Sequence, residues 1–111
     1  MSDVPAETQE KINKLQIMEQ SMQNYLGQKQ QFQSQLLEIE SALSELEKTN
    51  QAYKIVGNIM VVAEKSKLTE ELTTKKETTE LRIKTLEKQE AKLREKTSEI
   101  QKEVKIGRAH V

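Results

Sequence analysis

Apolar residues recur along the first half of the chain at alternating steps of three and four positions. The series runs Leu15, Met18, Met22, Tyr25, Lys29, Phe32, Leu36, Ile39, Leu43 and Leu46. Nine of the ten are apolar, and this 3.5-residue period predicts a coiled-coil helix rather than a single amphipathic helix on another domain. Pro5 suits a first helical turn, so we expect a helix over about residues 5–49. The polar exception, Lys29, either fixes register or extends its ammonium to water, and we favour the second interpretation.

The second half repeats the same steps with more polar residues. Its series is Leu72, Lys76, Thr79, Ile83, Leu86, Glu90, Leu93, Thr97, Ile100 and Val104, of which six of ten are apolar. We expect Ser66 to cap a helix over about residues 66–104, with Glu70 and Glu71 favourable near its amino end. The dense Glu and Lys residues beside the series are interpreted as a solvated face.

Between the two series the pattern changes from helical to strand-like. Residues 53–63 are rich in β-branched side chains and have Gly57-Asn58 at their centre, which predicts a β-hairpin. We expect both turn residues to adopt positive φ. Pairing about this turn places Val56 opposite Ile59 and Tyr53 opposite Val62.

Both faces of this hairpin are mainly apolar. An isolated two-stranded hairpin is marginally stable in water, and its open edges can pair with other chains. We therefore expect it to be an oligomerisation surface, the alternative being a hairpin folded back on its own helices. The residues assigned to this surface are Tyr53, Ile55, Val56, Gly57, Asn58, Ile59, Met60, Val61 and Val62. The predicted fold is mainly α: a long antiparallel two-helix coiled coil with one β-hairpin at the bend.

Composition excludes several functional classes. Only 34% of the 111 residues are hydrophobic and 32% are charged, which suits a helical seam better than a globular core. The 18 basic and 18 acidic residues balance, so we expect neither nucleic-acid nor membrane binding. There are no cysteines, no glycine-rich phosphate loop and a single histidine, His110. We expect no catalytic site, no metal and no cofactor, and a cytoplasmic location.

Three segments of the chain resemble the prefoldin β family, especially its archaeal members. They are the hairpin, Tyr53-Lys-Ile-Val-Gly-Asn-Ile, and the second-helix run Leu81-Arg-Ile-Lys-Thr-Leu-Glu-Lys-Gln-Glu90, with Glu70-Glu71-Leu72 before it. The resemblance implies a hexamer of two α and four β subunits whose hairpins form a β-barrel platform. It also implies ATP-independent capture of unfolded proteins at the coiled-coil tips and their delivery to a group II chaperonin. One hairpin, rather than two, is the β-type arrangement.

Client capture requires adaptable apolar surface, which methionine supplies well. We expect such a surface near the chain ends, where Leu15, Met18 and Met22 lie on the seam and Ile12 and Ile17 lie off it. The alternative for the seam residues is simple burial against the other helix. The full candidate set is Val4, Ile12, Leu15, Ile17, Met18, Met22, Ile100 and Val104. A structural or tethering coiled coil without chaperone activity is the alternative function, although it leaves the apolar hairpin unexplained.

The last six residues, Ile106-Gly-Arg-Ala-His-Val111, break the heptad pattern. They match what one reading frame of a widely used sequencing-library adapter encodes. Our hypothesis is that residues 106–111 are a non-native tail, so His110 is assigned no function.

Overall fold

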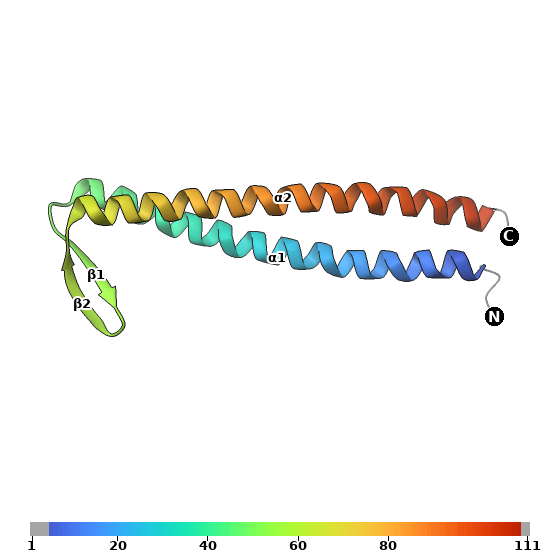
Figure 1. The fold of residues 1–111 in the computed structure, drawn as a ribbon, viewed down its shortest axis with the longest axis horizontal. Helices are drawn as coiled ribbons and strands as arrows, with labels where there is room; N and C mark the ends of the chain where they lie inside the picture. Colours follow the sequence, from blue (N-terminus) through green and yellow to red (C-terminus); the bar gives the residue numbers. More distant parts are fainter. Residues whose placement is uncertain (1–4, 110–111) are drawn as a thin grey trace. The chain divides into compact units, whose positions relative to one another are not determined.

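Two long helices joined by a two-stranded hairpin make up the fold (Figure 1). The computed structural model describes residues 5–109, with side chains up to residue 106. Helix α1 spans Ala6–Lys48, strands β1 and β2 span Ala52–Val56 and Ile59–Ala63, and helix α2 spans Lys65–Ala109. The mainly helical fold with one hairpin, expected from the two seams, is confirmed.

The helix starts follow directly from the segments that precede them. The Pro5 carbonyl accepts a hydrogen bond from the Gln9 N–H at 3.0 Å, so α1 begins immediately after the proline. The Glu64 carbonyl accepts a hydrogen bond from the Leu68 N–H at 2.9 Å, so α2 begins at Lys65, with Glu64 as the single residue linking it to β2. Ser66 therefore lies inside the first turn, and its predicted role as the helix cap is wrong. Helix α2 continues to Ala109, five residues past the expected end.

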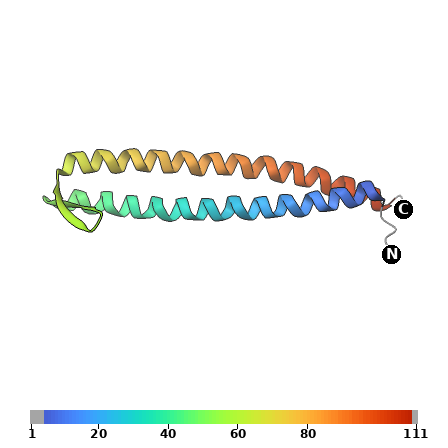
Figure 2. The same ribbon diagram turned by 60° about the horizontal axis from the view of Figure 1, so that its bottom comes forward.

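The described chain divides into two compact units. The terminal unit comprises residues 5–29 and 85–109, and the hairpin unit comprises Gln30–Lys84. In the terminal unit, Lys11 pairs with Glu103 at 3.4 Å and Lys29 with Glu90 at 3.1 Å, so α1 and α2 run antiparallel. In the hairpin unit the Arg82 guanidinium lies 5.5 Å from the centre of the Phe32 ring. Figures 1 and 2 both show the helices side by side within each unit.

All twenty positions of the two predicted seams are buried or half-buried. Thr8 and Lys11 continue the first seam by the same steps, and Thr8 is buried. No described side chain is completely enclosed, because a seam between two helices leaves the flanks of each side chain open to water. The core is therefore thin, with Leu46, Ile83 and Leu86 among its most buried residues.

The hairpin has the predicted register. Val56 pairs with Ile59 and Tyr53 with Val62, and the ladder closes at Ala52 and Ala63. Gly57 has a φ of +62°, but no non-glycine residue among those described has positive φ. The expectation that Asn58 also adopts positive φ is therefore wrong. A positive φ at the first turn residue alone is the sign pattern of a type II′ turn.

Candidate protein-binding surfaces

The hairpin presents an exposed apolar face. Because side chains alternate along each strand, Tyr53, Ile55, Met60 and Val62 share one side, which we call the outer face. All four are exposed, and Val62 exposes 78% of its surface. Exposure of four large apolar side chains together makes this face a candidate interaction surface.

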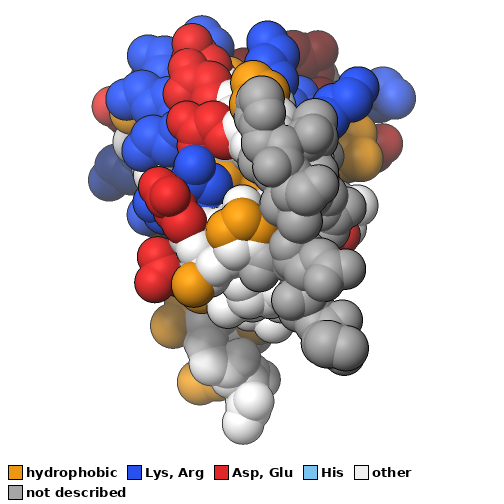
Figure 3. Space-filling view, turned by 90° about the vertical axis from the view of Figure 1, so that its right-hand side faces the viewer, with side chains coloured by type: hydrophobic (Ala, Val, Ile, Leu, Met, Phe, Trp, Pro, Cys, Tyr) orange, Lys and Arg blue, Asp and Glu red, His pale blue; other side chains and the backbone are white. Residues whose placement is uncertain are grey.

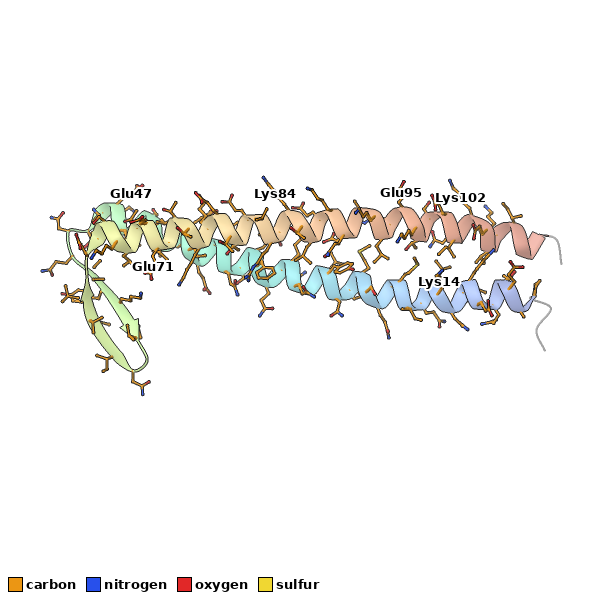
Figure 4. The ribbon with its side chains drawn as sticks, in the orientation of Figure 1. Lys14, Glu47, Glu71, Lys84, Glu95 and Lys102 are labelled. Carbon is orange, nitrogen blue, oxygen red and sulfur yellow. The ribbon has the colours of Figure 1, made fainter. Side chains whose placement is uncertain are left out.

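The opposite, inner face of the hairpin bonds to α2 through Lys54, whereas its apolar residues Val56, Ile59 and Val61 are also exposed. Ala52 is buried, and an open groove lies between this face and α2, lined by Lys54, Val61, Leu68 and Glu71 among others. Lys54 Nζ donates to Glu71 Oε1 at 2.8 Å and to Oε2 at 3.1 Å. This hydrogen bond and the charge of Lys54 lower the pKa of Glu71. Figure 4 places Glu71 on the hairpin side of α2.

Thr49 forms two hydrogen bonds within the link between α1 and β1. Its hydroxyl donates to the Gln51 carbonyl at 2.9 Å and accepts from the Gln51 N–H at 3.3 Å. These two bonds give partners to the backbone C=O and N–H of Gln51, between the end of α1 and the start of β1.

The terminal unit has an open groove between its two helices. Ile12, Leu15, Met18 and Met22 of α1 line one side, and Arg94, Thr97, Ser98 and Gln101 of α2 line the other. The groove lies where small polar residues of α2 face the methionines. The Thr97 hydroxyl reaches Met18 Sδ at 3.8 Å, and both methionines stay half-buried.

The predicted client-binding residues occupy different environments in this unit. The four that line the groove come together, and Ile17 lies off it with 65% of its surface exposed. Ile100 is half-buried and Val104 is buried. Val4 lies outside the described residues, as does His110. Figure 3, which views the end of this unit, shows charged side chains of both signs with small hydrophobic patches between them.

Charged residues beside the seams lie on the solvated face, as expected. Lys84, Glu95 and Lys102 are exposed and point away from the seam (Figure 4). Within residues 5–109, no group of three or more metal-ligating His, Asp or Glu side chains is present. Neither helix, over the same range, contains an apolar stretch of the length that a membrane span requires.

Two polar residues of the seams form a buried ion pair that the sequence interpretation missed. Lys29 Nζ lies 3.1 Å from Glu90 Oε1 and donates to Oε2 at 3.2 Å. The side chain of Glu90 is 3% exposed and that of Lys29 is 19% exposed. The expectation that Lys29 extends its ammonium to water is therefore wrong, because a buried carboxylate on the facing helix attracts it.

Comparisons with known proteins agree with this architecture. The sequence profile of the prefoldin subunit family matches residues 9–107. The chain is 42% identical over 107 residues to prefoldin subunit beta of Archaeoglobus fulgidus, covering 94% of this chain and 92% of the relative. It is 38% identical over 110 residues to prefoldin subunit beta of Thermococcus onnurineus, covering 96% and 95%.

A solved structure has the same fold. The crystal structure of the prefoldin beta subunit from Thermococcus strain KS-1 superposes with a TM-score of 0.87 at 36% sequence identity, covering 94% of each chain. The resemblance inferred from the hairpin and from the Leu81–Glu90 run is thereby confirmed. The chain belongs to the prefoldin β subunit family.

Proposed function

We propose that this chain is a subunit of an ATP-independent cytoplasmic chaperone. It assembles through its hairpin with α-type and other β-type subunits into a hexamer of two α and four β subunits. The hexamer binds unfolded proteins at its coiled-coil tips and delivers them to a group II chaperonin. Family membership supports the class of function, and the exposed apolar hairpin is the observation that carries the proposal.

The hairpin supports assembly on physical grounds. Its outer face, with Ile55 and Val62 among its residues, places large apolar side chains in water, and its two strands have only each other as partners. Covering these side chains is favourable by about 25 cal/mol for each Å² of apolar surface removed from water. Further strands from other subunits would also satisfy the open edges. A barrel formed from several hairpins meets both requirements at once.

The groove of the terminal unit supports client binding. It offers half-buried Met18 and Met22 beside small polar residues, with exposed Ile17 nearby on α1. Flexible, polarizable methionine side chains adapt to apolar segments of different shape. Such a surface suits a chaperone that must bind many unrelated sequences.

Native mass measurement tests the assembly. The full chain is co-expressed with an archaeal α-type subunit, and the purified product is weighed by native mass spectrometry. We expect a single species with the mass of two α and four β subunits. If the chain remains a monomer both alone and with the α-type subunit, the assembly proposal fails and a tethering coiled coil becomes the better account.

A further inference from the structure

The Lys29–Glu90 pair sits at an unusual place for two charges. Both residues occupy seam positions, where helix pairs normally bury apolar side chains. Arg94 adds a second cation near the carboxylate, with Nη2 at 3.6 Å from Glu90 Oε2, but Arg94 itself is largely exposed. Of these two cations, only Lys29 contacts Glu90 from the facing helix.

A buried ion pair does little for stability. Removing both charges from water costs about as much as their attraction returns, so apolar residues of similar size are often as good or better. Breaking the pair by removing one partner is costly, because the other charge is left buried. The main effect of such a pair is therefore on which helices pair with each other and in which register.

The first seam has a strong competing partner, namely a second copy of itself. Nine of its ten positions are apolar, whereas the α2 seam has six of ten. By apolar content alone, α1 would pair with α1 of another chain at least as well as with α2. In a parallel pairing of that kind every seam residue meets itself, so Lys29 would face a second Lys29 in a half-buried site.

Shifted arrangements of α1 against α2 meet a similar obstacle. Moving one helix by a heptad places Glu90 opposite Met22 or Leu36 of α1. In those registers Glu90 keeps the largely exposed Arg94 of its own helix but has no cation on the facing helix, so its burial against an apolar side chain carries a desolvation cost. The native pairing is the one that joins the two charges.

We propose that the Lys29–Glu90 pair selects the antiparallel α1–α2 pairing over pairing of α1 with α1 of a second copy, and that this selection is its main role. The pair is an element of pairing specificity rather than of stability. This inference concerns how the helices choose partners and stands independently of the proposed chaperone function.

Cysteine cross-linking tests the proposal, because the natural chain has no cysteine. Met18→Cys on the α1 seam forms a disulfide between two chains only when their α1 helices lie parallel and in register. The full chain carrying Met18→Cys is equilibrated in a glutathione redox buffer at fixed protein concentration. The fraction of interchain disulfide is compared across backgrounds: unchanged, Lys29→Leu with Glu90→Leu, and the charge swap Lys29→Glu with Glu90→Lys. Lys76→Leu serves as a matched control, because it adds a leucine to the α2 seam and keeps the ion pair.

The expected result is specific to charge. The double leucine variant should raise the interchain disulfide roughly tenfold, the change that corresponds to about 1.4 kcal/mol of lost discrimination. The charge swap and Lys76→Leu should stay at the level of the unchanged background. Equal disulfide in all four backgrounds would overturn the proposal, and so would a rise in the swap or in Lys76→Leu equal to that of the double leucine variant.

Thermal unfolding separates selection from stabilisation. The double leucine variant is expected to melt at the same temperature as the natural chain or higher. A lower melting temperature would mean that the pair mainly stabilises the fold, which contradicts the proposal.

Discussion

Lys54 on strand β1 and Glu71 on helix α2 form a hydrogen-bonded ion pair with Nζ–Oε distances of 2.8 and 3.1 Å. The two residues are 17 positions apart in the chain, and their pair ties the hairpin to α2. In the proposed assembly, the orientation of the hairpin would affect how the subunit joins the other subunits. This pair is therefore a point at which pH can act on the chain.

Replacing Lys54 with methionine should raise the pKa of Glu71 towards its ordinary value of 4.5. Since the pKa of Glu71 is lowered in the folded chain, the pair stabilises the fold above pH 4.5, and this stabilisation is lost as pH falls through the lowered value. The natural chain should exceed Lys54→Met in stability near neutral pH and match it in strong acid. Carboxyl NMR titration of Glu71 and urea unfolding at both pH values measure this. Lys67→Met is the control; identical Glu71 titrations in the natural chain and in Lys54→Met would contradict the prediction.

Two glycines should respond to alanine in opposite directions. Gly57 has a φ of +62° and open space where a Cβ would stand, so Gly57→Ala should destabilise by about 1–2 kcal/mol through backbone strain alone. Gly27 also faces open space but lies inside α1, so Gly27→Ala should stabilise by about 0.5–1 kcal/mol. Urea unfolding monitored by circular dichroism measures both. Stabilisation by Gly57→Ala would contradict the described turn geometry, and destabilisation by Gly27→Ala would contradict the account of Gly27.

Lysines on the outer face of the hairpin should prevent assembly without unfolding the chain. Ile55→Lys with Val62→Lys places charges on side chains that are already exposed, so helicity should not change. Burying those charges between subunits would be costly, so the product with an α-type subunit should shift from hexamer to smaller species. Leu37→Lys is the control, since Leu37 exposes 66% of its surface on α1. Normal hexamer formation by the double lysine variant would exclude the outer face as the contact.

Ile17 and Leu37 form a second matched comparison, this time for client binding. They are equally exposed, at 65% and 66%, but Ile17 belongs to the terminal unit and Leu37 to the hairpin unit. Ile17→Ser should weaken the suppression of client aggregation by the assembled particle several-fold, whereas Leu37→Ser should leave it unchanged. Both variants should keep the natural stability within about 0.5 kcal/mol, as is usual for surface substitutions. Equal loss of suppression in both would mean that clients do not bind selectively at the terminal unit.

Much of the fold could be predicted, because the helices follow a 3.5-residue apolar period and the hairpin follows the two-residue alternation of strands. Alternating steps of three and four placed Leu46, Ile83 and the other seam residues on buried faces, and a turn at Gly57 set the strand register. Helix ends were harder to predict. The first hydrogen bond of α2 is accepted by the carbonyl of Glu64, and Ser66 does not cap the helix. Such a choice depends on where the preceding strand stops, which periodicity does not reveal.

The ion pairs show what single-helix reasoning leaves out. Lys29 and Glu90 each looked like a defect in its own seam. Aligning the two seams in opposite directions makes Lys29, the fifth position of the first, face Glu90, the fifth from the end of the second. That signal was present in the sequence. Lys54 and Glu71 carried no comparable signal, because the angle of the hairpin against α2 brings them together.

Suppression of client aggregation tests the proposed function most directly. An unfolded model client is diluted into buffer without nucleotide, with or without the assembled particle, and light scattering is followed. The account predicts that the particle suppresses scattering at near-stoichiometric amounts and that ATP makes no difference. An assembled hexamer that leaves the scattering of several unrelated clients unchanged would contradict it.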